Sequence, residues 1–448
     1  MIDSNDPWVP WEPNEKEPWD LLRAAHLVRR AGFAVTFQEL DALVAQGYER
    51  TVDQLFQLGG REDFEIEMAP IEQTIGSQQD PAALASWWLL RMVGSPCQLL
   101  EKITFFWHGH FATSADKVAD AKAMLAQNRV LRANALGSFE TLLQLISRDV
   151  AMLTYLDSTE NRKTRPNENY ARELMELFCL GPGNYTEGDI KELARCFTGW
   201  EVRQNRFQFN KHQHDTGIKS LLGRSGHFSG EEAVRIVLEQ PAAATFIAGK
   251  LVRFFCTDNE LDAELLKPLA GKLRENDFAI APVLRKILTS RYFWSDRSMG
   301  QKVRSPVELA IGMIRTLGLS TNMYELRRRL SALGQLPMFP PNVKGWEGGR
   351  TWINAATFVE RINLVVQMAN EAANQSGHRS IARMLVFSAG GQLSQQIDRL
   401  VDHFFAVRPP EATLERLVES FRRQSGGTNE QVKELLVALA AIPEFHLI

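Results

Sequence analysis

The sequence has little cysteine and no long hydrophobic run. Its four cysteines among 448 residues lie far apart in apolar stretches and form no CxxC pair; they are Cys97, Cys179, Cys196 and Cys256. Such cysteines are typical of buried free thiols, not of disulfides or a zinc cluster. Because no run approaches the roughly 18 apolar residues that a spanning helix needs, no membrane span is predicted.

An excess of one charge and an export signal are also lacking. The 51 Lys and Arg residues nearly balance the 54 Asp and Glu residues, and the net charge of −3 gives no electrostatic drive toward nucleic acid. The N-terminal segment 1–13 has no basic stretch followed by an apolar one. We therefore expect a cytoplasmic protein as the sequence is written, or a periplasmic one if a partner carries it out.

Strand patterns are scarce, and no repeat of fixed period is present. Only Glu201 to Phe209 roughly alternates apolar and polar residues before a turn-rich stretch. From Asp20 onward the 3.6-residue helical period dominates. We predict a mainly α fold: an irregular N-terminal arm (1–19), then one large multi-helix domain (20–448) with one or two small β-hairpins. A long Gly/Pro/Trp-rich loop is expected from Leu333 to Trp352.

The helical pattern is strong enough to place individual helices. Predicted helices cover 20–31, 81–92, 97–107, 114–135, 138–152, 166–181, 186–198, 241–255, 305–317, 354–371 and 429–439. Several have recognisable starts. Ser305, Pro306 and Glu308 occupy the N-cap, first and third positions of one helix, and Thr186 with Asp189 resembles a capping box.

Two of the nine histidines, His108 and His110, lie two residues apart at the end of an aromatic run. Neutral imidazole is a common metal ligand. On a continuous helix these side chains point about 200° apart, so a shared metal ion requires the helix to break near Trp107, which Gly109 makes plausible. The alternative is that one histidine is buried against backbone and the other is exposed.

A second segment, from Pro166 to Phe178, is dense in acids and amides. Glu173 and Glu176 share a helix face, and Arg172 is four residues from both Glu168 and Glu176. These residues form either a salt-bridged surface or, since the face of Glu173 is otherwise apolar, a functional carboxylate site.

The loop Lys211–Gly217 again places two histidines two residues apart. Its His214 and Asp215 are candidate metal ligands, with Asp215 as a second ligand or as a group that orients His214. The alternative is a polar surface turn. If the three segments converge, they offer a mixed nitrogen and oxygen ligand set suited to a divalent transition metal: zinc, iron, manganese or copper. No nucleotide cofactor is expected.

Basic and aromatic residues form a fourth group. Lys302 precedes a helix, Lys344 and Trp346 lie in the long loop, and Arg361 lies on the following helix. The cations could hold an anionic substrate, together with Arg172, or they could pair with the glutamates.

These motifs together resemble a bacterial family, domain of unknown function 1800 (DUF1800). The resemblance rests on FWHGHFATS, NENYARELMELFCLG, the stretch from Tyr185-Thr186-Glu187 to Thr198-Gly199-Trp200, HDTG, PPNVKGW, Arg361-Ile-Asn-Leu, the opening segment 24–33 and Pro443-Glu444-Phe445. It covers the chain from about residue 20 to the end. The family has no settled activity. Its members often carry export signals and a histidine where this chain has Phe178, and they are commonly encoded beside a second family, DUF1501, which resembles sulfatases and alkaline phosphatases.

Three functional hypotheses follow. The first is a metal-dependent oxidoreductase or hydrolase, with the metal among His108, His110, Glu173, His214 and Asp215, and with Glu168 or Glu176 as general base. In it Arg172, Lys302, Lys344, Trp346 and Arg361 bind substrate. The second is a non-catalytic partner or escort of a DUF1501-type protein, with the Trp-rich arm and the long loop as contact surface. The third is a metal-free carboxylate hydrolase acting on saccharides.

Overall fold

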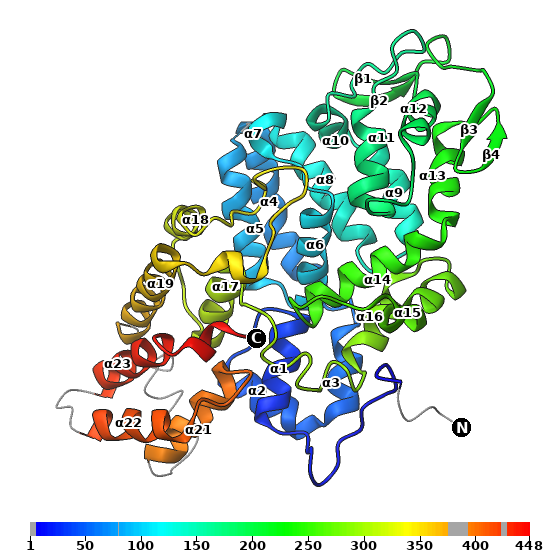
Figure 1. The fold of residues 1–448 in the computed structure, drawn as a ribbon. Helices are drawn as coiled ribbons and strands as arrows, with labels where there is room; N and C mark the ends of the chain where they lie inside the picture. Colours follow the sequence, from blue (N-terminus) through cyan, green and yellow to red (C-terminus); the bar gives the residue numbers. More distant parts are fainter. Residues whose placement is uncertain (1–5, 79, 375–392, 423–427) are drawn as a thin grey trace.

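The chain folds into a mainly α domain, as its helical periodicity predicts (Figure 1). The structure is a computed structural model and describes residues 6–78, 80–374, 393–422 and 428–448. Within these ranges the only sheets are two antiparallel hairpins. None of the described helices has the length and apolar character needed to cross a membrane.

The chain from Leu21 to Cys196 is mostly helical. Its helices are α1 (Leu21–Ala31), α2 (Phe37–Gln46), α3 (Tyr48–Leu55), α4 (Glu62–Gln78), α5 (Pro81–Gly94), α6 (Gln98–His110), α7 (Ala115–Val118), α8 (Ala121–Asn134), α9 (Phe139–Ser147), α10 (Val150–Tyr155), α11 (Asn169–Glu173), the π-helix η1 (Leu174–Cys179) and α12 (Glu187–Cys196).

The hairpins follow, and then two further groups of helices. The strands are β1 (Trp200–Arg203), β2 (Arg206–Phe209), β3 (Lys219–Leu221) and β4 (Arg224–Gly226). The helices are α13 (Gly230–Glu239), α14 (Pro241–Phe255), α15 (Ala263–Glu275), α16 (Ile280–Leu288), α17 (Pro306–Leu317), α18 (Met323–Ala332), the 3₁₀ turn η2 (Gly349–Trp352), α19 (Ala355–Ala373), α21 (Leu393–Phe404), α22 (Glu411–Arg422), α23 (Thr428–Ala440) and η4 (Pro443–His446). The predicted strand segment 201–209 is thus a hairpin, β1 with β2, in which Val202 pairs with Phe207.

Helix α6, near the centre of the view in Figure 1, contributes side chains to two hydrophobic cores. Its Phe106 and Trp107 belong to the core built with α9 and α12–α16, whereas Phe105 belongs to the core built with α5, α17 and the C-terminal helices. A helix that is buried on nearly every side cannot show a clean apolar stripe. α6 therefore contributes to both cores, as does α8, whose Leu131 belongs to the first and Met124 to the second.

Two long predicted helices are each divided in the structure. The segment 114–135 breaks after α7 because Ala119 adopts a left-handed conformation (φ 51°), and Asp120 then caps α8. The segment 138–152 breaks at Arg148, and Asp149 accepts the Met152 N–H to start α10. In both cases an internal Asp offers the backbone an N-cap, which competes with continuing the helix.

The predicted helix 166–181 is the least regular. It consists of the short α11 followed by the π-helix η1, which contains Glu176 and Phe178. π-helical turns are rare and often occur at functional sites. This turn brings the Phe178 backbone against α6, where its carbonyl contacts His110.

The described part of the N-terminal arm, residues 6–19, contains no helix or strand and lies against the rest of the domain. Trp8 and Trp11 are buried, and the Trp8 indole N–H donates to the Leu265 carbonyl at 2.6 Å. The Trp11 ring stacks on Trp294 at 4.7 Å. These tryptophans anchor the arm to its own chain.

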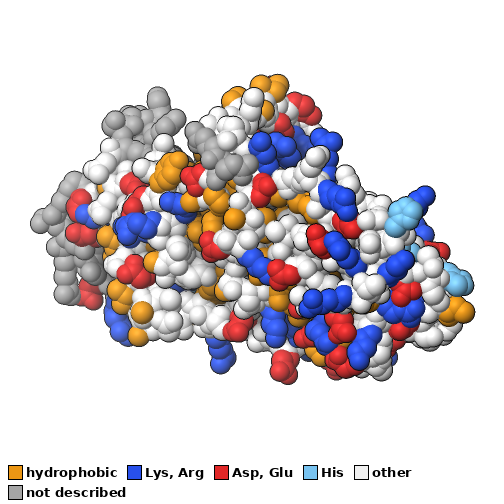
Figure 2. Space-filling model, turned by 90° about the horizontal axis from the view of Figure 1, so that it is seen from above, with side chains coloured by type: hydrophobic (Ala, Val, Ile, Leu, Met, Phe, Trp, Pro, Cys, Tyr) orange, Lys and Arg blue, Asp and Glu red, His pale blue; other side chains and the backbone are white. Residues whose placement is uncertain are grey.

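The long loop predicted at 333–352 is present and ends in the η2 turn. It crosses the end of α6, where Trp346 packs beside Phe105 and His108. On the face seen in Figure 2, Lys and Arg side chains are interspersed with Asp and Glu.

Candidate functional site

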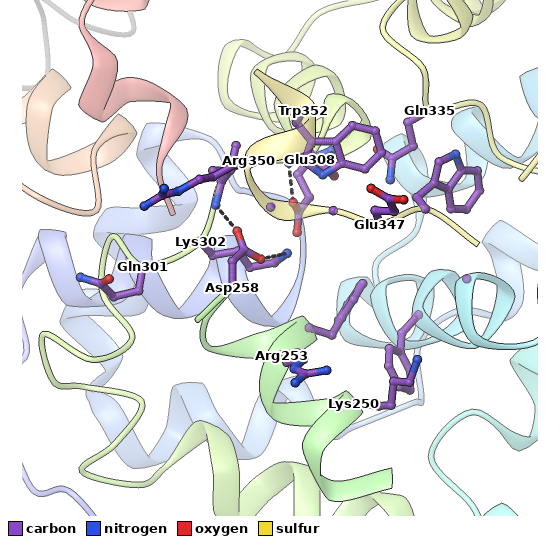
Figure 3. A pocket seen from close by; sticks show the side chains of 18 of the residues that line it. Lys250, Arg253, Asp258, Gln301, Lys302, Glu308, Gln335, Glu347, Arg350 and Trp352 are labelled. Carbon is purple, nitrogen blue, oxygen red and sulfur yellow. Dashed lines mark hydrogen bonds and ion pairs between the residues drawn. The ribbon is translucent and has the colours of Figure 1, made fainter. Parts of the chain in front are cut away.

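A cavity of about 710 Å³ lies between α6, α14, the start of α17 and the 333–352 loop (Figure 3). Its aromatic walls are Phe105, Phe106, Phe254, Trp346 and Trp352. Concave sites of some 300–1,000 Å³ with apolar walls and a few polar groups are typical of small-molecule binding. We call this space the α6–α14 cavity.

Two ion pairs fix one wall of the α6–α14 cavity. Glu308 accepts a hydrogen bond from Lys102 Nζ at 2.6 Å through Oε1 and from the Ser305 N–H at 2.8 Å through Oε2. Lys302 Nζ lies 3.6 Å from Asp258 Oδ1. Burial alone would raise the pKa of Glu308, but the ammonium groups of Lys102 and Lys302 hold that pKa well below its usual range. Glu308 is therefore a fixed anion of this wall.

The rest of the lining carries several cations that have no acidic partner among the described residues. Lys250 and Arg253 lie three residues apart on one face of α14 and, like Lys344 and Arg350 of the loop, make no ion pair within the described ranges. Burial lowers the pKa of Lys250, and the neighbouring Arg253 adds to this effect. Two carboxylates of the lining, Glu260 and Glu347, also lack ion-pair partners in the described chain.

His110 lines the α6–α14 cavity close to these cations. Its Nε2 lies 3.0 Å from the Phe178 carbonyl oxygen, and its Nδ1 has no hydrogen-bond partner among the described residues. Burial lowers its pKa well below the ordinary value, and the Lys250 charge lowers it further. His110 is thus a neutral imidazole.

His108 lies on the other side of α6 and does not line the cavity. Its Nε2 accepts the Met338 N–H at 3.1 Å, and burial lowers its pKa to about 3. The helix break that a shared metal ion would require is absent, since α6 runs through His110. The condition for a metal ion shared by His108 and His110 is therefore not met, because the two rings point to different surroundings.

Gly109 does not break α6, and the long loop packs against the α6 backbone at this glycine. A Cβ at Gly345 of the loop, which has φ +76°, would lie 2.4 Å from the Gly109 carbonyl oxygen. The loop therefore approaches the α6 backbone too closely for a side chain at position 345. Gly109 itself remains helical, and a Cβ there would make only an ordinary contact with Trp346.

The acidic segment forms surface ion pairs outside the cavity lining. Arg172 pairs with Glu187 at 2.7 Å and with Glu168 at 3.5 Å, and Glu176 accepts the Tyr185 hydroxyl at 3.2 Å. Burial raises the pKa of Glu173, and the neighbouring charge of Glu176 raises it further. Arg172 and Lys344 oppose this rise.

His214 and Asp215 hold the hairpin region together. His214 Nδ1 donates to the Thr198 carbonyl at 2.8 Å, and the Asp215 N–H donates to Thr198 Oγ1 at 2.7 Å. The Asp215 carboxylate accepts from Arg195 at 2.7 and 3.2 Å. These bonds tie the HDTG loop to the end of α12.

Only four of the residues predicted for the site line the α6–α14 cavity: His110, Lys302, Lys344 and Trp346. Arg361 is buried behind it, donating to the Arg304 carbonyl at 2.6 Å. In the described ranges no three His, Cys, Asp or Glu residues are grouped so that they could hold a metal ion. The predicted ligand set therefore does not fit a metal centre in this arrangement.

Sequence reasoning missed Lys102, Lys250 and Asp258 and took Glu308 only as a helix cap. One signal was available: Glu101 and Lys102 interrupt an apolar helix, and charged residues are almost never fully buried unless paired. Both are buried, Lys102 against Glu308 and Glu101 against Arg132 at 3.0 Å. Lys250 carries no comparable local signal.

Comparison with known proteins bears on the whole chain. No curated protein and no solved structure matches it. One family model matches residues 26–447, and its description is "Protein of unknown function (DUF1800)". This match spans the cavity-forming helices and the hairpins alike, and by it the chain belongs to the DUF1800 family.

Proposed function

We propose that the protein binds a small organic anion, bearing carboxylate or phosphate groups, in the α6–α14 cavity. The observation that carries the proposal is the pair Lys250 and Arg253, two cations on one face of α14 with no acidic partner in the described chain. A charge beside a low-dielectric wall interacts strongly with an opposite charge. An anion that enters the cavity supplies the missing partner.

The walls support an organic ligand over a bare ion. Phe106, Phe254 and Trp346 offer apolar surface to a carbon skeleton, while Glu260 and Glu347 accept hydrogen bonds from its polar groups. Arg253 can bind a carboxylate or phosphate through two parallel N–H groups, whereas Lys250 acts as a point charge.

The other functional hypotheses gain less support. A metal-dependent reaction would need ligands other than the predicted set, whose members lie in separate parts of the fold. The escort hypothesis used the Trp-rich arm and the 333–352 loop as contact surface, and in the arm Trp8 and Trp11 are buried in their own chain. The saccharide hydrolase hypothesis needs two carboxylates across a cleft. Glu173 and Glu176 share one helix face, so it already required a third acid, and neither of the two lines the cavity.

Calorimetric titration with a panel of anions tests the proposal. We expect binding by at least one phosphate or carboxylate ligand, weakened tenfold or more in Lys250→Gln and in Arg253→Gln. The matched control is Lys267→Gln, which removes the same charge from an exposed site on α15 where Lys267 pairs with Glu264. Equal weakening in all three variants, or no binding to the native protein, would contradict the proposal.

A further inference from the structure

We infer that Lys250 is a nucleophile, whose Nζ forms an imine with the carbonyl carbon of a 2-oxo acid bound in the α6–α14 cavity. The inference rests on the proposed function and narrows its ligand from small organic anions in general to 2-oxo acids. Arg253 binds the carboxylate of this ligand, which is bonded directly to the reacting carbonyl carbon.

Lys250 lines the α6–α14 cavity as a partly buried side chain of α14 (Figure 3). Its ammonium makes no hydrogen bond and no ion pair in the part of the chain that the structure describes. Its Nζ is nevertheless not one of the fully buried unpartnered atoms, which include Nδ1 of His110. Lys250 Nζ therefore keeps accessible surface, and a ligand in the cavity can reach it.

Lys250 lies in surroundings that favour the neutral amine, which is the form that attacks a carbonyl. Burial lowers the pKa of Lys250, and the positive charge of Arg253 lowers it further. His110 of α6, on which the charge of Lys250 acts, is a neutral imidazole. The Phe246 ring, 5.2 Å from Nζ, offers a weak cation–π attraction but no negative charge. More of Lys250 is therefore neutral near pH 7 than of an ordinary lysine.

The other two lysines of the cavity lining are less suited to this role. Lys302 Nζ lies 3.6 Å from Asp258 Oδ1, so a carboxylate stands beside its ammonium. Lys344 is exposed on the loop, where its charge acts on Glu173. Lys250 instead combines partial burial with a cationic neighbour, and this combination activates a lysine as a nucleophile.

Arg253 is placed to bind the carboxylate of the same ligand. It follows Lys250 by three residues on α14, so the two side chains leave one face of the helix with about 5–6 Å between their Cβ atoms. Both side chains line the cavity, and Arg253 is exposed. A guanidinium can bind a carboxylate through two parallel N–H groups. Because the carboxylate and carbonyl carbons of a 2-oxo acid are neighbours, two long side chains from one helix face can engage both.

The bond changes need no further reactant. The lone pair of neutral Lys250 Nζ attacks the carbonyl carbon, and the electron pair of the C=O bond moves to the oxygen. The carbinolamine then loses this oxygen together with the two protons of the amine as water, and a C=N bond replaces the C=O bond. Protonation of the imine restores the positive charge at position 250, beside which the carboxylate stays bound.

Reduction with borohydride tests this step, because hydride converts an imine into a stable secondary amine. We would treat the native protein with pyruvate or 2-oxoglutarate and sodium borohydride, and locate the adduct by peptide mapping with mass spectrometry. We expect the adduct on Lys250, with half of its maximal amount reached below pH 10.5, the ordinary pKa of lysine. Lys250→Arg keeps the positive charge but forms no imine, so it should lose the adduct. The matched control Lys267→Arg, at an exposed site on α15, should keep it.

Glutarate, which has a methylene group where 2-oxoglutarate has its carbonyl, separates imine formation from anion binding. Calorimetry should find that Lys250→Arg binds glutarate about as well as the native protein does, since the charge is kept. Arg253→Gln should raise the 2-oxoglutarate concentration at which half of the adduct forms. No adduct from either oxo acid, or an adduct that persists in Lys250→Arg, would overturn the inference, while anion binding by the native protein would leave the proposed function intact. Binding by no anion at all would instead contradict the proposed function.

Discussion

Lys102 Nζ lies 2.6 Å from Glu308 Oε1, and both side chains are buried, although 206 positions of the chain separate them. The pair joins α6 to the first turn of α17, and Glu308 lines the α6–α14 cavity. Desolvation lowers the pKa of Lys102 to about 8 despite the favourable charge of Glu308.

Removing one partner of this ion pair should lower the free energy of unfolding more than removing both partners. Lys102→Met leaves Glu308 buried without its shortest contact, and breaking a buried pair costs about 3–5 kcal/mol. The double variant Lys102→Met/Glu308→Gln leaves no buried carboxylate and should recover much of that loss. Urea denaturation would measure both. An exposed control, Lys267→Met, should cost less than about 1 kcal/mol. A double variant no more stable than Lys102→Met would contradict this account.

The stability of the native protein should fall as the pH drops below about 4.5. The folded-state pKa values of Glu308 and Glu101 are both held below the ordinary 4.5 by neighbouring Lys and Arg residues. A carboxylate with a depressed folded pKa stabilises fully above its unfolded pKa and loses that contribution as protons bind. Melting temperatures between pH 6 and 3 should therefore converge for the native protein and Glu308→Gln; parallel curves would contradict this expectation.

The two glycines at the contact between the loop and α6 should respond in opposite ways. Gly345→Ala forces a left-handed residue and a contact at 2.4 Å with the Gly109 carbonyl, so we expect a loss of at least about 1–2 kcal/mol. Gly109→Ala meets only Trp346 Cε3 at 4.0 Å, and alanine favours the helix by up to about 1 kcal/mol. Thermal denaturation of both variants checks this. Destabilisation by Gly109→Ala would contradict this prediction and would indicate that Gly109 breaks the helix.

Asp215 should matter for the hairpins and not for ligand binding. Asp215→Asn weakens the two bonds to Arg195, and because both side chains are partly exposed the cost should be about 1–2 kcal/mol. Anion affinity and bound transition metal, measured by titration and elemental analysis, should match the native protein. A drop in bound metal in this variant would show that Asp215 is a ligand after all.

Local signals predicted much of the secondary structure. The helix from Pro241 to Phe255 has the predicted bounds, and the capping box of Ser305 with Glu308 forms as expected. Such signals act within four residues, so the sequence states them directly. They failed at Ala119 and Asp149, where an internal cap outcompeted a continuous periodic pattern.

The candidate site was less predictable. His110, Lys302, Lys344 and Trp346 were identified because histidine, lysine and tryptophan in a motif attract notice, but the same reasoning selected His214 and Asp215, which bond to the hairpin region. Residue type shows what chemistry a side chain can perform. It does not show which other side chain it meets.

By itself the sequence determined the mainly α fold, most helix positions, the long loop and the family. Only the tertiary structure decided that His108 and His110 face different surroundings, that Lys102 meets Glu308, and that Lys250 forms no ion pair with any described residue. The physical reason is the separation along the chain over which each kind of interaction acts. Helix propensity and capping depend on neighbours in sequence, whereas burial and charge pairing depend on how distant helices pack around α6.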